Sequence, residues 1–159
     1  MSLSVGDEAP GFVLDGIDGA TGRRGIYELE SYRGGPVVVV FYPADNSAVC
    51  TAQLAAYTAG ISSFDSLGAQ VLAISPQSLD KHAAFAGVNG GFAFPLLSDP
   101  GKAVGREWGN LGLLDLYRRS TFVLDAEGII TYSHRYIGPG LAFKGVDELA
   151  AAVAEAAAR

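Results

Sequence analysis

Short runs of apolar residues predict buried strands at several points along the chain. Pro36–Tyr42 is a continuous stretch of β-branched and aromatic residues, typical of a central strand covered on both faces. Gln70–Ser75 and Phe94–Leu97 predict two further strands. Ser120–Leu124 and Ile129–His134 flank a turn that ends in glycine, and they predict a β-hairpin.

Between these runs, apolar residues recur every three to five positions, which predicts helices with one core face. Val49–Leu67 has this spacing, and Gly60 within it predicts a bend. Ser78–Val88 predicts a helix capped by its serine, and Asp99–Trp108 predicts a short helix capped by its aspartate with proline at the first helical position. Val146–Ala158 predicts an alanine-rich closing helix.

The segment before the first central strand is punctuated by proline and glycine. Phe12–Leu14 predicts a short strand, Gly19–Tyr27 a second strand or hairpin, and Leu29–Gly35 a single helical turn. Strands that alternate with helices and end in a hairpin and a helix predict an α/β fold. We expect a thioredoxin-like α/β sandwich with a central mixed sheet and an N-terminal strand or hairpin extension. No repeat or linker is visible, so residues 1–159 are expected to form a single domain.

Composition narrows the classes of protein further. The chain has 159 residues, of which 49% are hydrophobic, a formal net charge of −6 and one cysteine. One cysteine excludes a fold held by internal disulfides, so a reducing cytoplasm fits best. No signal peptide or membrane span is expected, because the start lacks a basic segment and no apolar run approaches about 20 residues. Basic residues are scattered singly, which argues against nucleic acid and anionic membranes as partners.

The single cysteine, Cys50, lies where a predicted strand passes into a predicted helix. A lone cysteine is more often an inert small hydrophobe, but the first turn of a helix favours a thiolate. A helix terminus stabilises a charge by at most about 2 kcal/mol, so a cation must help if the thiolate is to dominate. Arg119 is the candidate, because it precedes a strand expected near Pro36–Tyr42.

The residues around the cysteine form a spaced motif, Pro43-x-x-x-Ser47-x-x-Cys50 followed by Thr51-x-Gln53. This motif resembles the signature of the peroxiredoxin family, which is Pro-x-x-x-(Thr/Ser)-x-x-Cys followed by Thr-x-(Glu/Gln). Arg119 stands three residues before a phenylalanine, as in that family. The resemblance extends from about residue 4 to the end of the chain, with further matches at residues 5–12, 32–34, 94–99 and 122–128. The bacterioferritin-comigratory, or Q-type, branch is the most similar.

By this resemblance, the chain is an antioxidant peroxidase in which Cys50 is the nucleophile that attacks a peroxide and becomes a sulfenic acid. The Ser47 hydroxyl and the Cys50 backbone N–H would bind the peroxide. Arg119 would stabilise the thiolate and the charge that develops on the breaking O–O bond.

The resemblance also implies residues that assist the reaction. Pro43 would shield the sulfur, and Gln53 would orient Arg119, with Thr51 as a further supporting residue. Each also has an ordinary structural explanation, as a turn former or a helix residue.

Two departures from the Q-type pattern affect the mechanism. Ser47 and Ala48 replace a common Thr-Pro pair, and Ala55 occupies the position where many members carry a second cysteine. The resemblance therefore implies a one-cysteine enzyme reduced by an external thiol, either a thioredoxin-like protein or a small thiol. Its substrates would be hydrogen peroxide and organic hydroperoxides. It would need no cofactor or metal and would act as a monomer or homodimer.

Other classes of function are weaker. The chain has no Cys-x-x-Cys for disulfide exchange, and a Cys–His hydrolase would need His82 or His134, each expected at the surface or half-buried. A metal site from one cysteine and two unspaced histidines is weaker still. A non-enzymatic, thioredoxin-like redox-sensing or interaction module remains open, because a reactive thiol without a resolving partner can act as a signal.

Overall fold

The strands and helices are described for residues 3–45, 47–136 and 143–159 of a computed structural model. The strands are β1 (Val13–Ile17), β2 (Arg24–Glu28), β3 (Val37–Phe41), β4 (Gln70–Ser75), β5 (Leu96–Ser98), β6 (Ser120–Leu124) and β7 (Ile130–Arg135). The helices are α1 (Ala48–Ala59), α2 (Ile61–Asp65), α3 (Leu79–Val88), α4 (Ala103–Glu107) and α5 (Val146–Ala157), with 3₁₀ turns at Leu29–Tyr32 and Leu113–Asp115. None of the helices in these ranges has the length and apolarity needed to span a bilayer.

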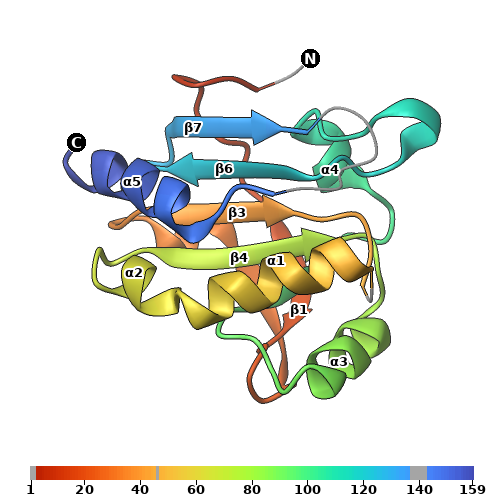
Figure 1. Ribbon diagram of the computed structural model, residues 1–159. Helices are drawn as coiled ribbons and strands as arrows, with labels where there is room; N and C mark the ends of the chain where they lie inside the picture. The colour runs from red at the N-terminus through yellow and green to blue at the C-terminus, as the bar shows by residue number, and fades with distance from the viewer. Residues whose placement is uncertain (1–2, 46, 137–142) are drawn as a thin grey trace.

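The described strands form one mixed sheet in the order β2-β1-β5-β4-β3-β6-β7 (Figure 1). Strand β3 is parallel to β4 and antiparallel to β6, and all five of its residues are buried. This confirms the central strand predicted from the β-branched run and the mixed sheet of a thioredoxin-like α/β fold. The β6–β7 hairpin is also confirmed.

The sheet is covered on both faces, and the side chains of β3 alternate between two apolar clusters. Val38 and Val40 face the cluster under α1, α2, α3 and α5, while Val37 and Val39 face the cluster that contains Trp108. Figure 1 shows α1, α2 and α5 in front of the sheet. The long apolar run is therefore explained by burial on both sides.

The bend predicted at Gly60 separates α1 from α2. The Gly60 backbone N–H donates to the Ala56 carbonyl at 3.0 Å, which closes α1. A Cβ on Gly60 would lie 2.8 Å from both methyl groups of Val146, at the start of α5. Glycine here allows the two helical segments and α5 to approach closely.

Some boundaries differ from the prediction. The first strand runs to Ile17 and forms a hairpin with β2, and β5 ends one residue later than expected. The short helix α4 begins only at Ala103, after Lys102 in a left-handed conformation with φ of 61°. Asp99 is therefore not its N-cap, although its carboxylate still accepts a hydrogen bond from the Gly105 backbone N–H at 2.9 Å. The loop between Asp99 and α4 was not visible in the spacing of apolar residues.

Candidate active site

Cys50 lies in the first turn of α1, directly after the loop that leaves β3. Ser47 is the N-cap of the helix, with extended backbone, and its Oγ accepts a hydrogen bond from the Cys50 backbone N–H at 3.1 Å. The cysteine side chain is 0% exposed. The serine hydroxyl thus lies beside the cysteine, and its own hydrogen remains available to a third group.

Arg119 contacts the sulfur from the neighbouring strand. The register of β3 and β6 pairs Phe41 with Ser120, so the chain segments that carry Cys50 and Arg119 adjoin the same end of the sheet. Arg119 Nη2 lies 3.2 Å from Cys50 Sγ, and the arginine is 3% exposed. A guanidinium at this distance in a buried setting stabilises a thiolate more than it would in water.

Gln53 links Arg119 to Tyr57, one turn further along the same face of α1. Its Oε1 accepts a hydrogen bond from Arg119 Nη1, and its Nε2 donates to the Tyr57 hydroxyl at 3.2 Å. Tyr57 in turn donates to the Lys144 carbonyl at 2.6 Å. Burial raises the pKa of Tyr57 to about 12, so the hydroxyl remains protonated at neutral pH. Because the Tyr57 hydroxyl stays protonated, it continues to accept from Gln53 Nε2, and Gln53 Oε1 remains directed at the Arg119 guanidinium.

Pro43 lies at the mouth of an open groove beside the cysteine. The groove has a volume of about 770 Å³, and its lining includes Pro43, Ala44, Tyr117 and Arg119. The described residues that line the groove do not include Cys50, which agrees with the burial of its side chain. Small molecules in the groove would therefore contact lining residues such as Pro43 and Arg119 and not the sulfur itself.

The Thr51 side chain bonds to the backbone of its own helix. Its hydroxyl donates to the Ser47 carbonyl at 2.8 Å, across the first turn of α1. It therefore supports the start of the helix.

A buried polar network lies behind the same loop. The Tyr42 hydroxyl donates to Asp45 Oδ1 at 2.7 Å, and His82 Nδ1 lies 2.7 Å from Asp45 Oδ2. His82 is 0% exposed, so the expectation of a surface or half-buried histidine is wrong for it. The other histidine, His134, is partly buried as expected, with its ring 4.4 Å from that of Tyr136.

Comparison with known proteins identifies the family. The model of the AhpC/TSA family matches residues 5–133, which is most of the chain. The chain belongs to this family of peroxiredoxins. The resemblance inferred from the signature is therefore confirmed, and the chain is a thiol-dependent peroxidase.

Individual relatives agree with this assignment. The peroxiredoxin-type protein Rv2521 of Mycobacterium tuberculosis is 38% identical over 80% of this chain and 82% of its own length. The chloroplastic peroxiredoxin Q of Triticum aestivum is 38% identical over 82% of this chain, which spans 58% of the wheat protein.

Solved structures give the same result for the fold. The bacterioferritin comigratory protein of Xanthomonas campestris superposes with a TM-score of 0.76 and 28% identity, over 92% of each chain. The AhpC of Mycobacterium tuberculosis gives a TM-score of 0.87 over 96% of this chain and 92% of its own, with 24% identity.

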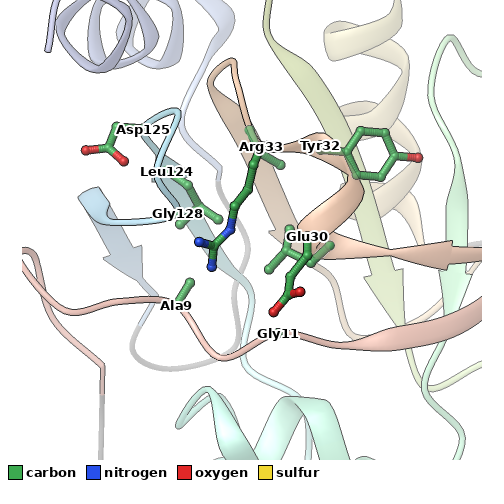
Figure 2. A pocket seen from close by; sticks show the side chains of 10 residues that line it. Ala9, Gly11, Glu30, Tyr32, Arg33, Leu124, Asp125 and Gly128 are labelled. Atoms are coloured by element: carbon green, nitrogen blue, oxygen red, sulfur yellow. The ribbon is translucent and has the colours of Figure 1, made fainter.

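A second pocket of this peroxiredoxin lies at the opposite end of β3. Figure 2 shows Arg33 extending between Gly128 and Glu30, with Ala9 below. Its cavity volume is about 10 Å³, which is room for roughly one water molecule. This cavity is too small to hold an organic hydroperoxide.

Three residues near the thiol were missed by reasoning from the sequence: Tyr42, Tyr57 and His82. His82 carried a signal, since it shares helical spacing with Phe85 and Ala86, both of which are buried. Tyr42 and Tyr57 counted only as members of apolar runs. The partner of His82 is set by the tertiary fold, whereas Tyr42 and Tyr57 bond to Asp45 and Gln53, which lie three and four residues away along the chain.

Proposed function

We propose that this peroxiredoxin reduces peroxides by a one-cysteine cycle at Cys50. The contact that carries the proposal is Arg119 Nη2 at 3.2 Å from Cys50 Sγ, at the N-terminus of α1. The thiolate attacks one peroxide oxygen, the O–O bond breaks, and the departing oxygen takes a proton to leave as water or an alcohol. Cys50 is oxidised to the sulfenic acid.

In this proposal Ser47 and Arg119 act on the peroxide directly. The Ser47 hydroxyl hydrogen is available to donate to a peroxide oxygen, while its Oγ accepts from the Cys50 N–H. The Arg119 guanidinium stabilises first the thiolate and then the charge that appears on the departing oxygen. A bound peroxide competes with Ser47 for the Cys50 N–H, since that N–H already has a partner.

The remaining predicted residues assist. Pro43 borders the groove and limits the approach of water to the sulfur, and Gln53 orients Arg119 through its Oε1. Thr51 supports the first turn of α1 through the Ser47 carbonyl. Each proposed role follows from a contact or a position in the described part of the chain.

The reductant in this cycle is a thiol from outside the chain, because Cys50 is its single cysteine. The external thiolate attacks the sulfenic sulfur and releases water, which leaves a mixed disulfide. A second thiol then reduces that disulfide and restores Cys50. Such a cycle fits a reducing compartment, and we propose the cytoplasm.

The substrates proposed are hydrogen peroxide and organic hydroperoxides. The groove beside Pro43 and Arg119 has a volume of about 770 Å³, which accommodates a substituent larger than hydrogen on the peroxide. An alkyl peroxide reduction activity is described for the related bacterioferritin comigratory protein of Xanthomonas campestris.

Intact-mass measurement tests the cycle. With one equivalent of hydrogen peroxide, the mass should rise by about 16 Da for sulfenic acid, and with excess peroxide by about 32 Da for sulfinic acid. Addition of a thiol after one equivalent should give a mixed disulfide and then the starting mass. Cys50→Ser is the control and should show none of these changes.

Two results would contradict the proposal. A disulfide-linked homodimer as the main product would mean that Cys50 of a second chain resolves the sulfenic acid. A single burst of peroxide consumption without turnover, under every thiol in a panel, would favour redox sensing over catalysis.

A further inference from the structure

A chain of hydrogen bonds runs from the arginine beside the sulfur, through α1, to the start of α5. Arg119 Nη1 donates to Gln53 Oε1, and Gln53 Nε2 donates to the Tyr57 hydroxyl at 3.2 Å. The Tyr57 hydroxyl donates to the Lys144 carbonyl at 2.6 Å. Gln53 and Tyr57 are both 0% exposed. The reaction cycle proposed above gives Tyr57 no part.

The Lys144 carbonyl gives this chain of hydrogen bonds a single direction. A backbone carbonyl only accepts, so the one hydrogen of the Tyr57 hydroxyl points to Lys144. Burial raises the pKa of Tyr57 to about 12, which keeps that hydrogen in place at neutral pH. The Tyr57 oxygen therefore has only lone pairs left for Gln53. The amide accordingly presents its NH₂ group to Tyr57 and its oxygen to the arginine.

Gln53 depends on this acceptor because its amide is buried. Within residues 3–45, 47–136 and 143–159, the acceptor that the structure gives to Gln53 Nε2 is the Tyr57 oxygen. Without it, a buried amide N–H would lose its partner, which costs free energy. The amide could recover a partner by turning or withdrawing from Arg119. A turned amide would place its own donors against the donors of the guanidinium.

We propose that Tyr57 is a positioning residue for the peroxidase reaction and that, together with the Lys144 carbonyl, it fixes the Gln53 amide with its oxygen toward Arg119. This inference rests on the proposed cycle, in which Arg119 acts on the thiolate and on the peroxide. It also connects the site to α5, since Lys144 lies two residues before the first residue of that helix. Loss of the Tyr57 hydroxyl therefore impairs oxidation of Cys50 through the arginine.

Tyr57→Phe removes the hydroxyl and keeps the packing of the ring. The Tyr57 ring lies nearly perpendicular to those of Phe64 and Phe143, with centroid separations of 6.3 and 6.0 Å. A phenylalanine ring can make both contacts. Tyr132→Phe is the matched control, because it removes a different tyrosine hydrogen bond to α5, from the Tyr132 hydroxyl to Glu148 Oε2 at 2.6 Å.

Gln53→Glu separates orientation of the side chain from its presence. A carboxylate has two accepting oxygens, so either way round it presents an oxygen to Arg119. Its orientation therefore needs no partner at position 57. The effect of the Tyr57 hydroxyl should be large when residue 53 is glutamine and small when it is glutamate.

The experiment measures stopped-flow oxidation by hydrogen peroxide and thiolate absorbance near neutral pH. Tyr57→Phe should lower the thiolate fraction and slow oxidation by about tenfold, which is about 1.4 kcal/mol in the barrier. The same substitution in a Gln53→Glu background should change the rate less than about twofold relative to Gln53→Glu alone. Tyr132→Phe should remain within about twofold of the wild type.

Gln53→Met provides a second background, in which the amide is absent and the length of the side chain is kept. Adding Tyr57→Phe there should again change oxidation by less than about twofold. This comparison stands even if Tyr57→Phe does not fold when residue 53 is glutamine. A further loss of rate on adding Tyr57→Phe would show that Tyr57 acts independently of the amide, which overturns the inference.

Three other outcomes would also overturn it. An unchanged rate and thiolate fraction in Tyr57→Phe would give the hydroxyl no part in oxidation. Equal slowing with glutamine and with glutamate at position 53 would give Tyr57 a purely structural role, and so would an equal loss in Tyr132→Phe. Failure of the proposed cycle is distinct, since the wild type itself would then form no sulfenic acid that a thiol can reduce.

Discussion

The reactivity proposed for Cys50 requires a charge from outside its own helix. A helix terminus stabilises a thiolate by at most about 2 kcal/mol. Arg119 supplies a buried guanidinium 3.2 Å from the sulfur, and Gln53 fixes its other nitrogen. The sequence offered Arg119 as the candidate because it precedes a strand expected near Pro36–Tyr42, and the resemblance to a family implied the same role, but the contact with the sulfur comes from the structure.

Arg119→Met should lower the fraction of thiolate at neutral pH and slow oxidation by about a hundredfold, because it removes the charge that faces both the sulfur and the departing oxygen. Thiolate absorbance and stopped-flow oxidation would measure the two effects. Arg119→Lys is the matched control. It keeps the charge without the planar fork and should retain part of the rate. If methionine leaves the absorbance unchanged, Arg119 is not the cation that stabilises the thiolate.

Ser47 combines a helix cap with a hydroxyl, and substitutions can separate the two. Ser47→Ala should lower the free energy of unfolding by about 1 kcal/mol and slow oxidation. Ser47→Asn should keep the cap but still slow oxidation, while Ser47→Thr should keep both properties. Denaturant unfolding measures the cap, and stopped-flow oxidation measures the hydroxyl. Wild-type oxidation rates in the asparagine and alanine variants would reduce Ser47 to a cap.

His82 shows where reasoning from single residues failed. Its partner Asp45 is 37 positions away, on a loop with no periodic pattern, so spacing along the chain does not pair them. The helical spacing of His82 with Phe85 and Ala86 is typical of the core face of a helix, but the sequence analysis did not use this signal. A histidine on such a face needs partners for both ring nitrogens, and only the tertiary fold identifies them.

At the scale of elements, the bend in the first long helix has a tertiary cause. Residues 49–67 have continuous helical spacing, and glycine alone marked the point where the helix divides. The structure adds the reason, since a Cβ on Gly60 would lie 2.8 Å from the methyl groups of Val146. Val146 starts α5, a helix that the sequence could not place against this turn.

Gly60→Ala should therefore destabilise the protein by about 1–3 kcal/mol, because valine is stiff and cannot move away easily. In a Val146→Ala background the same substitution should be neutral or slightly stabilising, since alanine restricts the unfolded chain. A double-mutant cycle of denaturant unfolding measures the coupling between the two sites. Additive effects would show that Gly60 and Val146 do not constrain each other.

The start of α4 is a failure of local reasoning at the same scale. Asp99 followed by proline resembles a cap, but the Asp99 carboxylate accepts hydrogen bonds from the Tyr117 hydroxyl and from the Gly105 N–H. The contact with Tyr117, 18 residues away, helps to hold the aspartate outside the cap position, which Lys102 occupies. The acidic group still faces the N-terminal turn of the helix, where a negative charge is favourable.

At the scale of the whole molecule, the sheet gathers the site from distant segments. Cys50 and Arg119 are 69 positions apart, and the antiparallel register of β3 and β6 brings them together. The alternation of strands and helices was enough to predict the α/β fold class, because only a few layered arrangements bury the apolar faces of both kinds of element. The order of the strands and the depth of each side chain needed the structure.

The pH dependence of the free energy of unfolding is a property of the whole molecule, because groups in different parts of the chain contribute to it. Burial, with a smaller effect from Lys144, lowers the pKa of His134 below its ordinary value of 6.5. The unfolded chain therefore binds a proton at His134 more readily than the folded one, so stability should fall as the pH falls through that value toward the lowered one. The pKa of Asp18 is also lowered, mainly by hydrogen bonds from the Thr21 and Ala20 N–H groups, and its loss of stability falls in a more acidic range.

His134→Gln should flatten the stability profile just below neutral pH and leave the acidic part in place. Thermal unfolding at intervals between about pH 2 and about pH 8 measures both ranges. The difference between the two proteins isolates His134, because both retain His82 and Asp18. A parallel profile for wild type and variant would mean that His134 titrates alike in the folded and unfolded chains. A variant that loses more stability than the wild type as the pH falls would reverse the sign and place a stabilising acceptor beside the imidazole.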